Sequence, residues 1–130
     1  MAHTRLTDGI YTLAANVIEE VGADEADAAR AQWVTRTHAK PHGGLLAAYV
    51  EAMGDAAQGR AHARGSEALC RAVVRLLAED IGLDQQATTR ECMYALMHVD
   101  LGLPYERVKA LLAALRRLCE AARIMPDVAE

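Results

Sequence analysis

Residues 18–24 read IEEVGAD and residues 78–84 read AEDIGLD, so one pattern occurs twice at a spacing of sixty positions. The same spacing continues through residues 18–38, where five aligned pairs are identical: Glu19 and Glu79, Gly22 and Gly82, Asp24 and Asp84, Arg30 and Arg90, and His38 and His98. A period of this size is typical of one supersecondary unit used repeatedly. The sequence therefore predicts two copies of one helical unit.

The apolar residues around this stretch recur at steps of three and four, which is the spacing of one face of an amphipathic helix. Gly22 and Gly82 suit the left-handed conformation that closes a helix, and Asp24 and Asp84 can cap the helix that follows. Pro104 fits the first turn of a final helix, where its missing N–H is no loss. Alternating strand patterns are absent. We therefore expect an all-α fold of about six helices, near residues 4–21, 25–38, 45–53, 66–81, 84–97 and 104–124.

We expect these helices to form two tandem three-helix repeats packed into a single domain that covers residues 1–130. Repeat one spans about residues 5–54, repeat two spans about residues 66–124, and residues 55–65 form a linker. The 130 residues are 52% hydrophobic but only 4% aromatic, with no Phe, so the core has to be built from aliphatic side chains and Ala. Such a core removes less apolar area per residue from water than a core rich in aromatic side chains, and each Å² contributes roughly 25 cal/mol. A monomer would therefore be only modestly stable. We therefore expect a homodimer.

The charge balance excludes proteins that coat nucleic acid without sequence preference, because those require a broad basic field. The formal net charge of this chain is -4. No signal peptide and no apolar run of membrane-spanning length is present, so no membrane partner is expected. Cys70, Cys92 and Cys119 are odd in number and lack CxxC spacing, which favours a reducing cytoplasm.

Residues 94–111, YALMHVDLGLPYERVKAL, carry the sharpest local signal. A helix-turn-helix needs a short first helix, a glycine-containing turn and a second helix held by apolar residues. Residues 101–103, Leu-Gly-Leu, supply such a turn, and Val108 and Leu111 supply the apolar positions. The segment resembles the helix-turn-helix of small bacterial and phage regulators. Residues 16–44 also resemble phage Mor-type activators in their order of a helix, Gly22, Ala26 and two glycines.

This resemblance implies a non-enzymatic transcriptional regulator that binds duplex DNA. Residues 101–123 contain five basic and two acidic residues, a local basic excess in an acidic chain. Base edges in the major groove would be contacted by Tyr105, Glu106, Arg107 and Lys109, and phosphates by Arg90, Arg116 and Arg117.

The alternative interpretation is a plain αα-hairpin whose basic residues form a solvated face. The chain would then be a small helical adaptor or inhibitor that binds another protein through the region of Trp33, Tyr49 and Met53, or through Ala-rich faces. The two functions differ in whether Arg107 and Lys109 stand exposed on a protruding helix or pack sideways into the other copy.

Metal and catalytic sites are not indicated. His38 and His42 are four residues apart, but Pro41 disrupts the helical face that this spacing needs. Cys92 and Cys119 lie on apolar-rich helices, where cysteine behaves as a small buried hydrophobe. We therefore expect no metal, no cofactor and no catalytic residue.

Overall fold

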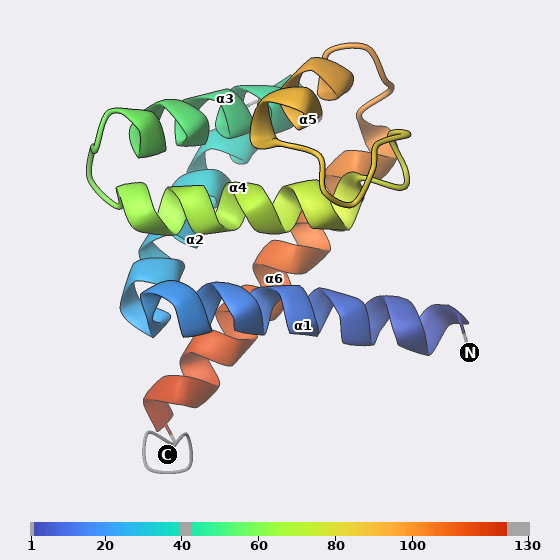
Figure 1. Cartoon of the computed structure of the whole chain (residues 1–130). Coiled ribbons are helices and arrows are strands. Elements are labelled where there is room, and N and C mark those ends of the chain that lie inside the picture. The colour runs from blue at the N-terminus through green and yellow to red at the C-terminus, as the bar shows by residue number, and fades with distance from the viewer. Residues whose placement is uncertain (1, 40–42, 125–130) are drawn as a thin grey trace.

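The computed structural model describes residues 2–39 and 43–124, so Pro41 lies outside them. Helices are the only regular secondary structure of the described residues, which confirms the all-α class and the six helices (Figure 1). The helices are α1 (Ala2–Val21), α2 (Ala23–Ala39), α3 (Gly43–Ala57), α4 (Ala63–Leu77), α5 (Thr89–Leu96) and α6 (Gly102–Ile124). None of these helices is both long enough and apolar enough to cross a membrane.

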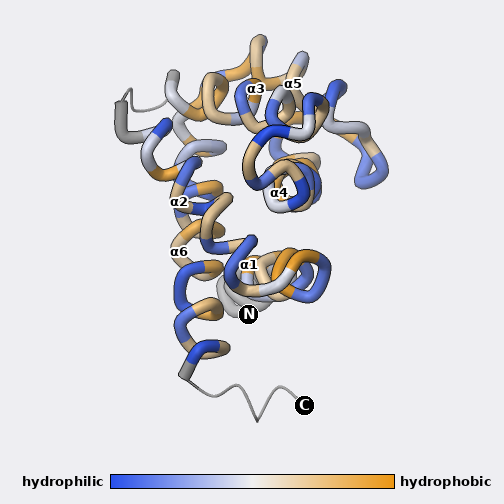
Figure 2. Tube along the Cα trace, turned by 90° about the vertical axis from the view of Figure 1, so that its left-hand side faces the viewer, coloured by the Kyte–Doolittle hydropathy of each residue, from blue (hydrophilic) through white to orange (hydrophobic). Residues whose placement is uncertain are grey.

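α4 packs against all five other helices, and α2 packs against α1, α3, α4 and α6. Figure 2 shows α4 between α1 on one side and α3 with α5 on the other, while α2 and α6 run along the flank. Trp33 of α2 is fully buried, and its ring meets Tyr49 of α3 edge to face, with centroids 6.1 Å apart. The core sits where these helices converge.

The helix order follows the sixty-residue spacing, because α1 corresponds to α4 and α3 to α6. Gly22 (φ 90°) and Gly82 (φ 74°) both adopt the left-handed conformation expected for a helix-closing residue. Gly22 follows α1 directly, whereas turns separate Gly82 from the end of α4. The third helix of each predicted copy packs on the first helix of the other, α3 on α4 and α6 on α1. Duplication itself stays a prediction.

The linker between the predicted copies is shorter than expected. α3 continues to Ala57 and α4 begins at Ala63, so residues 58–62 join the helices in place of residues 55–65. Alanine has the highest helix propensity, which explains the extension of α3. Ser66, at the expected start of α4, lies inside that helix and is fully buried.

The helix expected at residues 84–97 is reduced to α5. Asp84 accepts a hydrogen bond of 2.8 Å from the Gln86 backbone N–H, a local turn that competes with helix formation. Thr88 then caps α5, because its hydroxyl accepts from the Glu91 N–H at 3.1 Å while the Glu91 carboxylate accepts from the Thr88 N–H at 3.1 Å. The cap of this helix therefore lies four residues after the predicted one.

Small residues allow α2 and α4 to approach closely. A Cβ atom at Gly65 would lie 2.9 Å from the Glu25 carbonyl oxygen and 3.0 Å from Ala29 Cβ. The Glu25 carboxylate also accepts a 3.0 Å hydrogen bond from the Gly65 N–H and lies 2.8 Å from His62 Nδ1. This crossing therefore depends on the absence of a side chain at residue 65.

Gly65→Ala is expected to lower the free energy of unfolding by about 1–2 kcal/mol, because the added methyl group overpacks the α2–α4 crossing. Gly9→Ala is the matched control, since nothing lies within 4 Å of a Cβ atom at that helical position. It should raise stability by about 0.5–1 kcal/mol through helix propensity. Urea denaturation of both variants measures these changes, and equal effects would contradict the close approach.

A buried carboxylate joins α2 to α3. Arg36 Nη2 donates to Asp55 Oδ2 at 2.7 Å, and Arg60 Nη1 donates to Asp55 Oδ1 at 3.3 Å. The Asp55 side chain is 8% exposed. The hydrogen bond from Arg36, the strongest influence, and that from Arg60 hold the pKa of Asp55 below its ordinary value, although burial acts in the opposite direction. The ionised carboxylate therefore stabilises the folded chain.

Asp55→Asn is expected to lower the free energy of unfolding by about 2 kcal/mol at neutral pH, because Arg36 loses its buried counter-charge. Since the folded-state pKa is depressed, this contribution is complete above about pH 5 and fades as the pH falls through the folded-state value. The difference between wild type and variant should therefore narrow as the pH falls below about 4, the ordinary pKa of an aspartate. A difference in urea midpoints that stays constant with pH would contradict this role.

Candidate functional site

A groove of about 440 Å³ lies between α2 and α6, and we call it the α2–α6 groove. Its α6 side is one helical face, since positions three and four apart on a helix lie above one another. Its α2 side is supplied by three residues at similar spacing. The lining residues are Arg30, Val34, Thr37, Tyr105, Val108, Lys109, Leu112, Ala113, Arg116, Arg117 and Glu120. The groove thus has an aliphatic floor and a charged rim.

The rim is mostly basic, with four cationic side chains and Glu120 as the one acidic member of the lining. Arg30 Nε pairs with Asp27 at 2.8 Å, and Arg116 Nε pairs with Glu120 at 3.1 Å. The Arg116–Glu120 pair is exposed, with side chains 65% and 54% accessible, and such pairs contribute about 0–1 kcal/mol. Arg116 can therefore exchange its carboxylate for one on a ligand at little cost, whereas the Arg30–Asp27 pair is mostly buried.

Lys109 and Arg117 hold the excess positive charge. Lys109 Nζ lies 4.0 Å from Glu106 Oε2 and 5.7 Å from the centre of the Tyr105 ring. Arg117 Nη1 donates to the Tyr11 hydroxyl at 3.2 Å, a neutral acceptor. Neither cation therefore has a carboxylate within hydrogen-bond distance among the described residues.

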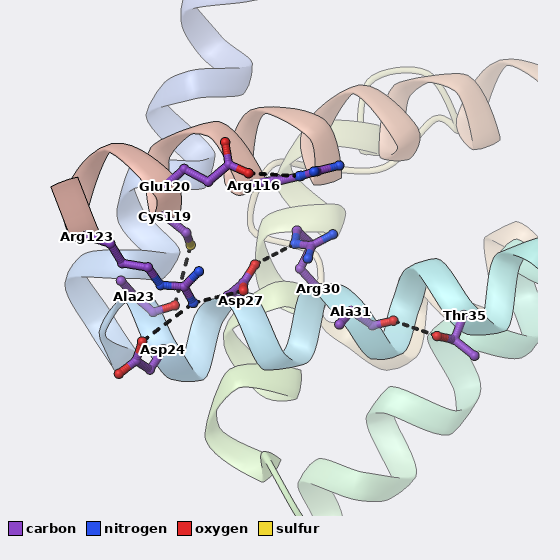
Figure 3. A network of polar contacts seen from close by, with 10 residues as sticks. All are labelled: Ala23, Asp24, Asp27, Arg30, Ala31, Thr35, Arg116, Cys119, Glu120 and Arg123. Carbon is purple, nitrogen blue, oxygen red and sulfur yellow. Dashed lines mark hydrogen bonds and ion pairs between the residues drawn. The ribbon is translucent and has the colours of Figure 1, made fainter.

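An ion-pair network fixes the adjoining end of the α2–α6 groove (Figure 3). Asp27 accepts hydrogen bonds from Arg30 at 2.8 Å and from Arg123 at 2.9 Å. Burial alone would raise the pKa of Asp27, but these two hydrogen bonds outweigh it and lower the pKa. Cys119 Sγ donates to the Ala23 carbonyl oxygen at 3.5 Å. These contacts hold α6 in register with α2.

The groove gathers four of the residues predicted to bind DNA: Tyr105, Lys109, Arg116 and Arg117. Glu106 lies beside the groove as the partner of Lys109. Arg90 is exposed on α5 and is not among the residues that line the groove. Arg30 and Val34 were not predicted, because the α2 side of the groove is defined by how the helices cross.

Arg107 lies on another side of α6. Its Nε atom is 2.6 Å from Asp80 Oδ2, and the two side chains are 24% and 19% exposed. The N–H direction does not satisfy hydrogen-bond geometry, so the contact is an ion pair. Side chains two positions apart on a helix point away from each other. Arg107 and Lys109 therefore do not share a surface.

The two helices of the predicted helix-turn-helix do not pack as a pair. α5 packs against α3 and α4, and throughout the described residues its contact with α6 is minor. Large apolar side chains are exposed around their connection, with Tyr94 and Met97 54% exposed and Leu103 57% exposed. In a DNA-binding helix-turn-helix, the first helix crosses the DNA backbone while the second helix lies in the major groove of the DNA.

The residues predicted for the protein-binding alternative lie mostly in the interior. Trp33 and Tyr49 have no exposed surface. The Tyr49 hydroxyl donates to the Thr89 carbonyl oxygen at 2.7 Å, which joins α3 to the start of α5. Met53 is half-buried and lines a separate groove beside α4. Of these three residues, only Met53 is accessible to a partner protein.

The cysteines are buried and free. Burial raises the pKa of the Cys70 thiol to about 12 and also raises the pKa values of Cys92 and Cys119, so the nucleophilic thiolate is disfavoured. Within residues 2–39 and 43–124, no three His, Cys, Asp or Glu side chains cluster as metal ligands. His42 lies outside the described residues, as does the side chain of His38.

Arg107→Ala and Asp80→Ala are each expected to lower the free energy of unfolding by about 1 kcal/mol, with a coupling of about 0.5–1 kcal/mol in the double variant. The exposed Lys109→Ala is the matched control and should change stability by less than about 0.5 kcal/mol. Urea denaturation measures all four variants. Strictly additive effects of the Arg107 and Asp80 changes would show that the pair contributes nothing.

No protein-family model, curated protein or solved structure matches this chain. The resemblance to Mor-type regulators therefore stays a prediction. The function has to be argued from the surface that the fold presents.

Proposed function

We propose that this chain is a non-enzymatic binding protein whose α2–α6 groove accepts an acidic, amphipathic helical segment of another protein. One observation carries the proposal: the groove combines an aliphatic floor with a rim of four cations and one carboxylate. A helix laid in a groove uses apolar anchors at steps of three and four residues, with charges flanking them. The proposal keeps the predicted protein-binding alternative, but the binding surface is the α2–α6 groove in place of the region of Trp33, Tyr49 and Met53.

The apolar part of the interaction involves Val34, Leu112 and Ala113, which form the floor between the two helices. Ala113 is exposed, so the floor is accessible from solvent beside it. Burying apolar anchors of a partner here would provide most of the affinity, at roughly 25 cal/mol per Å² removed from water. The rim then selects the sign of the partner's charge.

The electrostatic part favours carboxylates on the partner. Lys109 has only the exposed Glu106 carboxylate at 4.0 Å, Arg117 donates to a neutral hydroxyl, and the exposed Arg116 can exchange its pairing with Glu120. Complementary rim charges mainly increase the association rate and the discrimination between partners. The contribution is therefore expected to weaken as salt is added.

DNA binding is the second candidate, and the exposure of Lys109 and Arg116 favours it. Their side chains are 64% and 65% exposed and lie seven positions apart, two turns along α6. Two such cations can contact phosphates without reading bases. The ion pair of Arg107 with Asp80 and the net charge of -4 weigh against sequence-specific recognition.

The first test is selection of random peptides of roughly four helical turns on the immobilised protein. We expect the selected peptides to carry apolar residues at three- and four-residue steps together with Asp and Glu. Ala113→Phe should weaken the best peptide by about tenfold or more because the ring fills the floor. Lys109→Glu should weaken it by about threefold to tenfold because the rim then repels acidic side chains.

Arg90→Glu is the matched control, since Arg90 is an exposed arginine outside the groove. It should leave peptide affinity unchanged. Salt-sensitive binding of duplex DNA that Lys109→Glu abolishes and Ala113→Phe leaves intact would overturn the proposal in favour of the second candidate. Selected peptides whose binding neither groove variant alters would also overturn it.

A further inference from the structure

A second groove, of about 660 Å³, lies between α3, α4 and the start of α5, and we call it the α3–α4 groove. None of its lining residues belongs to the α2–α6 groove. Its apolar members come from all three segments: Met53, Ala56, Ala57, Cys70, Val74 and Ala87. Its polar members are Glu67, Arg71, Arg75, Gln85, Gln86, Thr88 and Thr89. A mostly apolar hollow with few polar groups is typical of a small-molecule site.

The two arginines of the α3–α4 groove differ in their partners. Arg71 binds the carboxylates of Glu20 and Glu67. Arg75 makes no hydrogen bond or ion pair with any described residue. It also borders a neighbouring hollow that contains Glu79 and Asp80, but Glu79 lies beyond ion-pair distance of Arg75 and Asp80 is paired with Arg107. The Arg75 guanidinium is therefore available to a ligand.

Two amide side chains stand near this cation. Gln85 and Gln86 both line the groove, and among the described residues neither side-chain amide has a hydrogen-bond partner. An amide N–H and a guanidinium can together bind one carboxylate, the guanidinium through two parallel hydrogen bonds. The carboxylate of Glu67 on the rim disfavours a ligand with several negative charges. The polar side of the groove thus suits a single anionic group.

We propose that the α3–α4 groove binds a monocarboxylate with an unbranched apolar tail, such as a medium-chain fatty acid. The carboxylate lies against Arg75 with Gln85 or Gln86 as a second donor. The tail lies along Met53, Val74 and Ala87, where its methylene groups leave water. The inference is independent of the function proposed for the α2–α6 groove.

Isothermal titration calorimetry with hexanoate, octanoate and decanoate, each below the concentration at which it aggregates, tests the apolar part. Each methylene that reaches the floor should raise the affinity by about threefold to fourfold. Decanol tests the anionic part, since it keeps the tail and removes the charge. It should bind at least about tenfold more weakly than decanoate, because the charge-assisted hydrogen bonds are lost.

Arg75→Gln should abolish the preference for decanoate over decanol while leaving decanol affinity unchanged. Arg90→Gln, an exposed arginine outside the groove, is the matched control and should retain the preference. Thermal unfolding without ligand verifies that both variants are folded. Equal binding of decanoate and decanol by the wild type, persistence of the preference in Arg75→Gln, or no decanoate binding at all would overturn the proposal.

Discussion

Burial of Trp33 is the interaction on which the other contacts of this bundle depend. The chain has one Trp and no Phe, and this indole is the largest side chain with no exposed surface. Its ring packs edge to face with Tyr49, and the Tyr49 hydroxyl in turn holds the start of α5 through the Thr89 carbonyl. The indole N–H has no hydrogen-bond partner among the described residues. An unsatisfied buried donor costs roughly 1–3 kcal/mol, so the packing around the ring has to outweigh that penalty. Small residues such as Ala29, which let neighbouring helices close on α2, make this packing possible.

Helix periodicity and helix-closing glycines were sufficient to predict the class and the number of helices, because both depend on residues close together in sequence. The boundaries of α5 were not predictable in the same way, since Asp84 forms a turn with its own backbone neighbours instead of capping a helix. The candidate site was predicted only in part. Lys109 and Arg116 were predicted from the resemblance to helix-turn-helix regulators, but the partner of Arg107 is Asp80, twenty-seven positions earlier. Charge composition does not reveal which cations a fold neutralises, and the contribution of α2 to the groove arises from tertiary packing.

Ion pairing sorts the basic residues of this acidic chain into two groups. Arg36, Arg71 and Arg107 each bind a carboxylate contributed by another segment, so their charges are used to hold helices together. Lys109 and Arg75 have no such tight partner, and each borders a groove with an apolar floor. The chain has a net charge of -4, and it nevertheless has local positive sites. At these sites a ligand would contact both the cationic side chain and the apolar floor of the groove. The two proposed ligands share this chemistry, an anionic group attached to an apolar body, but differ in size.

The packing of α6 on α1 and of α3 on α4 also determines when the chain can fold as it leaves the ribosome. The apolar stripe of α1 has α6 as a main partner, and roughly one hundred residues separate the end of α1 from the end of α6. At about 5–20 residues per second, synthesis of that interval takes on the order of 5–20 s. During this time α1 and α2 expose surfaces that the finished protein covers. The nascent chain therefore passes through a period in which it depends on dilution or on chaperones to avoid aggregation, and folding is completed only after α6 has emerged.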